Sequence, residues 1–164
     1  MSHSDKILIY TDGSSLGNPG PGGYGIVMKT SGSDYEKHFS QGFKRTTNNR
    51  MELMAVIEAL KKIKNKSLPV EIYTDSKYVV DAINNGWLQK WKNQNFIKTK
   101  NPDLWKEFLK VSKDFDYSIH WIKGHNNHPE NEICDKLAVK AAKSTDLIPD
   151  KGFEDKENPP GLLF

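Results

Sequence analysis

The sequence Ile-Tyr-Thr-Asp occurs twice, and each copy ends an apolar run with an aspartate that could hold a metal ion. The first run, 7–12, ends at Asp12, and the second, 70–75, ends at Asp75. Their β-branched and aromatic residues predict β-strands. If these strands are parallel neighbours, their carboxyl ends lie about 5 Å apart at a sheet edge where α/β proteins bind ligands. Two carboxylates so close repel unless a cation lies between them, and oxygen ligands of this kind suit Mg²⁺ or Mn²⁺.

Two further acids could join this site, although each of the four has a simpler interpretation when taken alone. Asp12 could start a turn, and Asp75 could cap the helix that follows it. Glu52 follows Asn49 by three residues, as in a capping box, and Asp135 could be a solvated helix acid. Together, the four acids occur on separate elements from which side chains can converge, and such a cluster could hold two divalent ions.

The rest of the chain is expected to alternate between strands and helices after a glycine-rich loop over residues 13–23. Strands are expected over residues 25–29, 36–43 and 117–123, and helices over 49–64, 76–84, 103–112 and 129–143. Three consecutive strands followed by alternating helices and strands indicate the α/β class, with a mixed sheet and helices packed on it.

Length and composition limit the class of protein. The 164 residues are enough for one domain that buries about two-thirds of its unfolded surface. With 36% hydrophobic and 27% charged residues, the composition is that of a water-soluble protein, and no apolar run approaches the roughly 20 residues of a membrane helix. Cys134 is the only cysteine, which excludes an internal disulfide and fits a reducing cytosol. We therefore expect a cytoplasmic protein with no membrane contact.

The net charge of +3 hides an uneven distribution along the chain. Residues 87–113 carry seven lysines and two acids, whereas residues 145–164 carry five acids and two lysines. Phosphate backbones respond to local fields, so the lysine-rich stretch is a candidate nucleic-acid contact.

Six blocks of residues resemble, in order and spacing, the successive motifs of type 1 ribonuclease H, the cellular form of that family. They lie between Lys6 and Lys143 and comprise Thr11-Asp12-Gly13-Ser14, Gly17-Asn18-Pro19-Gly20-Pro21-Gly22-Gly23-Tyr24-Gly25, Thr46-Thr47-Asn48-Asn49-Arg50-Met51-Glu52-Leu53, Thr74-Asp75-Ser76, Trp121-Ile122-Lys123-Gly124-His125 and Asn131-Glu132-Ile133-Cys134-Asp135.

The resemblance implies a fold and a reaction. The implied fold is a ribonuclease H-like mixed sheet of five strands in the order 3-2-1-4-5, flanked by helices on both faces. The implied catalytic domain spans residues 1–144, with a basic protrusion at about residues 87–101. The implied reaction is hydrolysis of the RNA strand of RNA–DNA hybrids, which leaves 5′-phosphate and 3′-hydroxyl ends.

By the same resemblance, the catalytic residues are Asp12, Glu52, Asp75, Asp135 and His125. The four acids match the ligands of Mg²⁺, with two ions per site when substrate is bound and Mn²⁺ as a substitute. One ion can lower the pKa of the attacking water while the other stabilises the departing 3′ oxygen, and a single-metal pathway is the alternative. The neutral imidazole of His125 could accept a proton from the attacking water or help to release product.

The resemblance also implies how the hybrid is held. Asn18, Asn48 and Asn49 match residues that recognise the 2′-hydroxyls of RNA across the minor groove, and Thr47 matches a contact to DNA phosphate. For Asn48, helix capping is an alternative or additional role. In the protrusion, lysines would neutralise DNA phosphates while a tryptophan packs against sugar. These residues are Trp87, Lys90, Trp91, Lys92, Lys98 and Lys100.

The tryptophans of the protrusion have a structural alternative. Trp87, Trp91 and Trp105 could be packing anchors between helices, and we expect this at least for Trp105. Because lysines cannot read base sequence, cleavage is expected to be largely sequence-independent.

The residues after 144 match none of the motifs. Prolines and glycines favour an extended tail over 145–164, which could be disordered, dock a protein partner or fold back onto the body.

We expect a monomer. Two other functions are weighed against a ribonuclease: an integrase-like nuclease that acts on DNA, and a hybrid-binding module without catalysis. The first would prefer duplex DNA, and the second would bind without divalent metal.

Overall fold

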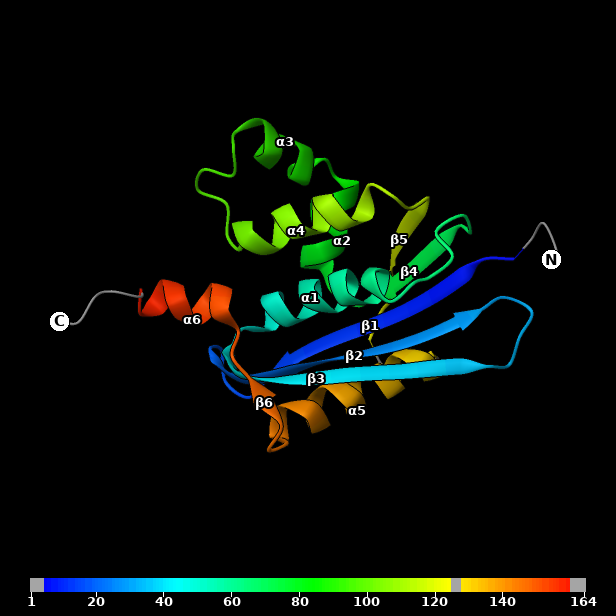
Figure 1. Cartoon of the computed structure of the whole chain (residues 1–164), viewed down its shortest axis with the longest axis horizontal. Coiled ribbons are helices and arrows are strands. Elements are labelled where there is room, and N and C mark those ends of the chain that lie inside the picture. Colours follow the sequence, from blue (N-terminus) through cyan, green and yellow to red (C-terminus); the bar gives the residue numbers. More distant parts are fainter. Residues whose placement is uncertain (1–4, 125–127, 160–164) are drawn as a thin grey trace.

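The computed structural model describes residues 5–124 and 128–159, which form a mixed sheet covered by helices on both faces (Figure 1). The strands are β1 (Ile7–Ser15), β2 (Gly20–Thr30), β3 (Glu36–Thr46), β4 (Val70–Thr74), β5 (Tyr117–Trp121) and β6 (Leu147–Ile148). The helices are α1 (Asn48–Lys61), α2 (Lys77–Asn84), α3 (Trp87–Asn93), α4 (Pro102–Ser112), α5 (Pro129–Lys143) and α6 (Lys151–Glu157).

The strand order is β5-β4-β1-β2-β3-β6, so the predicted order of the first five strands is confirmed. The first three strands form an antiparallel meander, whereas β1 pairs with β4 in parallel. In that pair Tyr10 lies opposite Tyr73 and Thr11 opposite Thr74. The register therefore brings the two Ile-Tyr-Thr-Asp runs to a common edge of the sheet.

One face of the sheet is covered by α1, with α2, α3 and α4 beyond it (Figure 1). The core on this side is apolar and fully buried, with Ile9 and Ile72 of the sheet against Leu53 of α1. Trp105 of α4 has no exposed surface and donates its ring N–H to the Tyr78 hydroxyl at 2.8 Å. The prediction that Trp105 is a packing anchor is thus confirmed.

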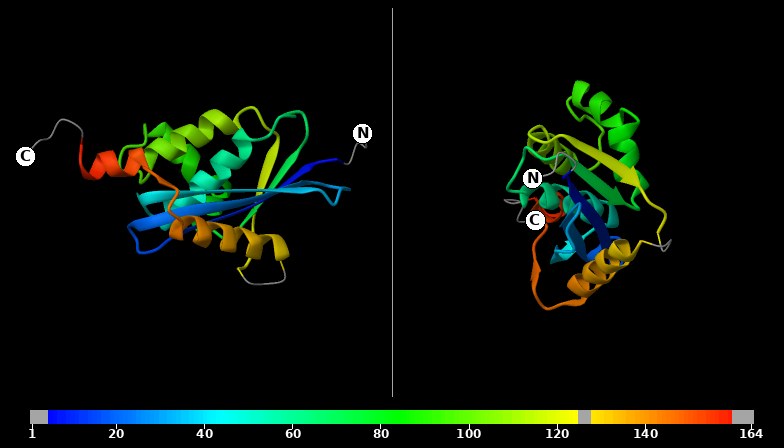
Figure 2. Two further views of the ribbon diagram at one scale, coloured as in Figure 1. Left: turned by 60° about the horizontal axis from the view of Figure 1, so that its bottom comes forward. Right: turned by 90° about the vertical axis from the view of Figure 1, so that its right-hand side faces the viewer.

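The opposite face is covered by α5 alone (Figure 2). This helix lies against strands that carry glycine at the contact. A Cβ on Gly25 would overlap the backbone of α5 at Cys134, and one on Gly23 would come within 2.6 Å of the Ala138 carbonyl oxygen. Glycine at these two positions therefore sets how closely the helix and the sheet approach.

Besides α3, a helix that was not among those expected, two stretches differ from the structure expected from sequence. The glycine-rich stretch 13–23 is not mainly a loop, because β1 continues to Ser15 and β2 begins at Gly20. Pairing between β1 and β2 runs as far as Ser15 opposite Gly22, since backbone hydrogen bonds do not need side chains. The connection between the strands is therefore only residues 16–19.

The segment after α5 contains regular structure. Strand β6 pairs with β3 through Gly42 and Phe43, and α6 follows it. The sequence favours an extended segment here, because its prolines and glycines suppress both helix and strand signals. Within the described residues, no helix is both long enough and apolar enough to cross a membrane.

Candidate metal and nucleic-acid site

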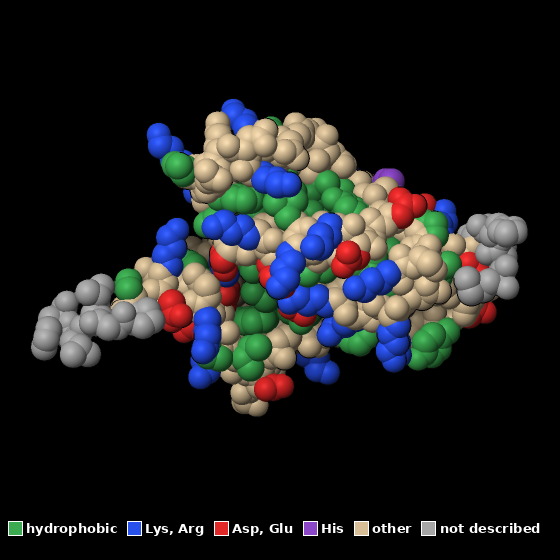
Figure 3. Space-filling view, turned by 45° about the horizontal axis from the view of Figure 1, so that its top comes forward, with side chains coloured by type: hydrophobic (Ala, Val, Ile, Leu, Met, Phe, Trp, Pro, Cys, Tyr) green, Lys and Arg blue, Asp and Glu red, His purple; other side chains and the backbone are tan. Residues whose placement is uncertain are grey.

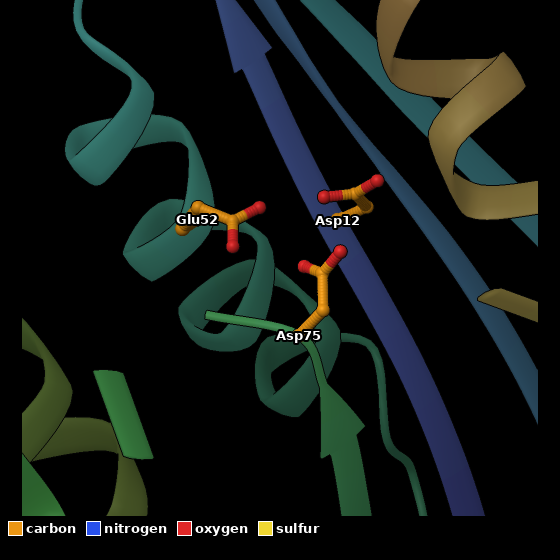
Figure 4. Close-up of side chains that lie close together, drawn as sticks. All are labelled: Asp12, Glu52 and Asp75. Carbon is orange, nitrogen blue, oxygen red and sulfur yellow. The ribbon is translucent and has the colours of Figure 1, made fainter. Parts of the chain in front are cut away.

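Three carboxylates converge beside the first turns of α1, one from within β1, one from α1 and one directly after the end of β4. The side chains of Asp12, Glu52 and Asp75 point toward one another (Figure 4), and each offers an oxygen within 4.8 Å of the others. Asp12 and Glu52 are buried, with 6% and 8% of their surface exposed. The structure therefore brings together three of the four acids expected to bind metal.

Backbone geometry holds these acids. It excludes the interpretations of Asp12 as a turn residue, of Asp75 as a helix cap and of Glu52 as part of a capping box. Asp12 lies inside β1 rather than at a turn, and α1 and α2 are capped by Thr47 and Ser76. The Glu52 carboxylate accepts a hydrogen bond from the Gly13 N–H, which also donates to the Asp12 carboxylate.

Gly13 is required at the contact between β1 and α1. A Cβ at this position would overlap the α1 backbone at Met51 and Glu52. Glycine lets the strand and the helix approach until one N–H serves two carboxylates, which are thereby fixed relative to each other.

The cluster is electrostatically strained without a cation. Burial is the main reason why the pKa of Asp12 rises from 3.8 to about 7, and the charges of Asp75 and Asp135 act in the same direction. The pKa of Glu52 is raised well above its ordinary range, first by burial and then by the Asp12 charge. A bound cation would favour the charged form of both carboxylates and so lower both pKa values.

The fourth acid and the histidine lie at the border of this site. Asp135 is half-buried on α5 and outside the group of three, but its charge acts on Asp12. Gly124 lies so close to Asp75 that a Cβ there would come within 3.1 Å of the carboxylate. His125, the next residue, lies outside the described residues.

The donor set fits a hard divalent cation. Carboxylate oxygens are the ligands that Mg²⁺ and Mn²⁺ prefer, and neither sulfur nor nitrogen is among the three ligand groups. Their raised pKa values have the physical cause that such a cation would remove.

The residues expected to recognise the hybrid form a hydrogen-bonded group at the start of α1. The Asn48 side-chain oxygen accepts from the Ser15 N–H at 2.7 Å, and the Asn48 N–H donates to the Asn18 side chain at 3.2 Å. Thr47 accepts from the Arg50 N–H as the helix cap, while Asn48 and Asn49 are exposed. Ser15 was missed from sequence, because only the strand pairing brings it to Asn48.

The predicted protrusion projects from the body as α3 and the turns that follow it. Trp87 is 46% exposed, Trp91 is half-buried, and their ring centroids lie 6.5 Å apart. Trp91 also packs on Trp105 at 5.7 Å. Four exposed lysines complete the protrusion: Lys90, Lys92, Lys98 and Lys100. None of these six residues lies in the carboxylate cluster.

Trp121, at the end of β5, contacts the backbone next to the carboxylate cluster. Its ring N–H donates to the Asp75 backbone carbonyl at 3.1 Å, and the Lys77 ammonium group lies 4.8 Å from the ring centroid.

A buried ion-pair group fixes the C-terminal segment, and sequence reasoning did not find it. Arg50, which is 3% exposed, donates to Asp150 at 2.7 and 2.9 Å and to Asp103 at 2.7 and 2.9 Å. The Thr46 hydroxyl also donates to Asp150. These partners are up to 104 residues apart, so no local pattern reveals the group.

A sheet of this order, with a carboxylate cluster at the ends of its adjacent parallel strands, defines the ribonuclease H-like class of metal-dependent α/β proteins. A family model described as RNase H matches residues 4–143. The chain belongs to the ribonuclease H family.

Individual relatives agree with this assignment. The chain is 56% identical over 138 residues to ribonuclease HI of Helicobacter pylori strain ATCC 700392 / 26695, covering 84% of this chain and 94% of that protein. LC9-RNase H1, described as a type 1 RNase H with the type 2 active-site motif, has a TM-score of 0.75 at 29% identity, over 96% of this chain and 83% of that one. LC11-RNase H1 in complex with an RNA/DNA hybrid has a TM-score of 0.58 at 28% identity, over 83% and 99%.

Proposed function

We propose that the protein is an endonuclease that hydrolyses the RNA strand of RNA–DNA hybrids and leaves 5′-phosphate and 3′-hydroxyl ends. The observation that carries this function is the convergence of Asp12, Glu52 and Asp75 in a ribonuclease H fold. The hybrid bound to LC11-RNase H1 supports the choice of substrate.

The cofactor is Mg²⁺, with Mn²⁺ as its substitute. Asp12, Glu52 and Asp75 would hold the ion, and Asp135 on α5 would join them when a second ion enters with the substrate. When bound, the metal supplies an acidified water and stabilises charge on the departing oxygen.

The protein's own groups orient the reaction around that centre. The doubly donating Gly13 N–H holds the Asp12 and Glu52 carboxylates in place before substrate arrives. Gly124, the residue before His125, lies close to the Asp75 carboxylate. The imidazole of His125 would accept the proton of the attacking water or help to release product.

Binding relies on two surfaces that differ in chemistry. The amide groups of Asn18, Asn48 and Asn49 lie at the start of α1, where they would read RNA 2′-hydroxyls, while Thr47 contacts a DNA phosphate. The lysines of the protrusion would neutralise further DNA phosphates. Since none of these contacts requires a particular base, cleavage is largely sequence-independent.

The test is cleavage of a hybrid labelled on its RNA strand, with Mg²⁺ or with EDTA. Asp75→Asn should lower kcat by at least about 100-fold, because it removes a charged metal ligand. Asp116→Asn is the matched control, since this exposed residue directly precedes β5. Intact RNA with both Mg²⁺ and Mn²⁺ would contradict the enzyme and leave a binding module, and cleavage of duplex DNA in preference to hybrid would favour an integrase-like nuclease.

A further inference from the structure

A groove of about 660 Å³ lies between the start of α1 and helix α6. One wall carries Asn18 and Thr47, the second of which is expected to contact DNA phosphate. The opposite wall carries Phe153 and Lys156 of α6, and Lys100 of the protrusion lies at its border. The match to the family model ends at residue 143, before α6 begins.

The two carboxylates that line the groove are already paired with arginines. Glu157 accepts two hydrogen bonds from the Arg45 guanidinium, at 2.7 and 3.0 Å. Asp103 likewise accepts two from Arg50. The Arg45–Glu157 pair is therefore neutral, whereas Arg50 also pairs with Asp150, so the Arg50 group keeps one net negative charge against the two lysine charges of the groove.

The two lysines of the groove, in contrast to its two carboxylates, form no ion pair among the described residues. Lys100 and Lys156 are exposed, and both line the same groove. In Figure 3 the outline of the molecule is indented between α6 and the α3–α4 region, and lysine and arginine side chains lie on both sides of the indentation. Unpaired positive charge is therefore available on the α6 wall, at Lys156, and at the border of the groove, at Lys100.

Helix α6 is held firmly enough to act as a wall. Asp150, immediately before it, is 3% exposed and accepts hydrogen bonds from both Arg50 and Thr46. The helix also lies directly on the Arg50–Asp103 pair, since a Cβ on Gly152 would overlap the Asp103 carboxylate. Arg45 ties down the other end of the helix through Glu157.

We propose that α6 is a second wall of the hybrid-binding surface and that Lys156, together with Lys100, binds a backbone phosphate of the DNA strand. This inference rests on the proposed function. A DNA backbone is the occupant that fits, because the groove is open and continuous with Thr47 and presents lysine ammonium groups, which contact phosphates without reading bases.

The test compares two lysines of the same helix in steady-state cleavage of a hybrid. Lys156→Gln should raise KM about 3–10-fold at low salt, keep kcat within about twofold, and reduce the slope of log(kcat/KM) against log salt by about one. Lys151→Gln removes the same charge from an exposed residue of α6 that does not line the groove, so its KM and slope should stay at the wild-type values.

A hybrid with single neutral methylphosphonates in its DNA strand locates the contact. At one position the neutral group should raise KM for the wild type and for Lys151→Gln but not further for Lys156→Gln. Gly152→Ala, which pushes α6 away from α4, should raise KM as Lys156→Gln does.

Three outcomes would overturn the proposal about α6. They are an unchanged KM for Lys156→Gln, equal effects of the two lysine variants, and additive effects of Lys156→Gln and methylphosphonate at every DNA position. Normal cleavage by the wild type in these assays would leave the proposed function intact, whereas no cleavage by the wild type would refute both.

Discussion

At the scale of single residues, Asp12 and Glu52 are arranged for a bound cation at a cost to the metal-free protein. Both carboxylates are buried beside Asp75, and burial raises the pKa of each. A chain selected only for stability would place amides or apolar groups here. The strained cluster is therefore a reason to assign function to these acids, as perturbed groups gather at active sites.

Replacing Asp12 by asparagine should stabilise the metal-free protein. The folded-state pKa of Asp12, about 7, lies above the ordinary 3.8, so the folded state binds its proton more tightly than the unfolded state. This contribution is complete below about pH 4 and is lost as the pH rises through about 7. In EDTA at pH 7.5, Asp12→Asn should raise the free energy of unfolding by about 1–3 kcal/mol, measured by urea denaturation.

The dependence on pH and on metal distinguishes relief of carboxylate strain at Asp12 from a general gain in stability. The difference between Asp12→Asn and wild type should shrink toward pH 4, and Mg²⁺ should stabilise wild type more than the variant. Asp116→Asn, which changes an exposed acid, serves as the control. A variant less stable than wild type at pH 7.5 in EDTA would show that the Asp12 carboxylate is not strained.

At the scale of elements, a charge group around the buried Arg50 adds to the strand pairing that joins the C-terminal segment to the body. Asp150 shares Arg50 with Asp103, and the guanidinium is almost inaccessible to water. Such a pair contributes little compared with apolar packing, but breaking it leaves a buried charge without its partner.

Replacing Asp150 by alanine should therefore lower the free energy of unfolding by about 2–4 kcal/mol, less than a complete loss because Asp103 remains on Arg50. Thermal and urea denaturation measure the change. Asp146→Ala, at an exposed position just before β6, should cost less than about 0.5 kcal/mol. Equal stability of Asp150→Ala and wild type would mean that α6 contributes nothing to the fold.

Local sequence signals predicted most helices and strands. They failed where the structure depends on contacts between segments that are far apart in sequence. Helix α5 was expected over the residues that it occupies, because its apolar spacing and Pro129 are local signals. The close packing of Gly25 on α5 and the pairing of Ser15 with Asn48 depend on segments far apart in sequence. Glycine is a local signal for a loop. Strand β2 was therefore expected to begin at Gly25, five residues after its actual start at Gly20.

The convergence of two of the carboxylates followed from a pattern that is visible in the sequence. The repeated Ile-Tyr-Thr-Asp pattern placed Asp12 and Asp75 together because strand register is a geometric consequence of parallel pairing. Asn18 and Asn48 were also predicted, on resemblance alone, and the structure joins them by a hydrogen bond. Arg50 was not found as a structural residue, since its partners Asp103 and Asp150 carry no pattern that connects them.

At the scale of the whole molecule, charge is distributed for contact with a long polyanion. The protrusion carries four exposed lysines, and one of them, Lys100, also lines the groove beside α6 together with Lys156. Such a field extends about one Debye length, roughly 8–10 Å at ordinary salt, and acts on phosphates over several nucleotides.

Removing the charge of the protrusion should weaken binding without changing chemistry. The combined change of Lys90, Lys92, Lys98 and Lys100 to glutamine should raise KM and flatten its salt dependence, with kcat within about twofold. The matched control changes four exposed lysines elsewhere, Lys64, Lys66, Lys110 and Lys113. A fall in kcat at unchanged KM would contradict a binding role for the protrusion.

The positions of the four tryptophans make the molecule its own optical probe. Trp87, Trp91 and Trp105 pack one against the next with tilted rings, whose centroids are 6.5 and 5.7 Å apart, so they lie close enough to exchange excitation energy. Trp121 stands apart from them and is hydrogen-bonded to the backbone of Asp75. Replacing Trp121 by phenylalanine would leave emission from the protrusion group alone. The difference between the two spectra would then follow events at the carboxylates, without any attached dye.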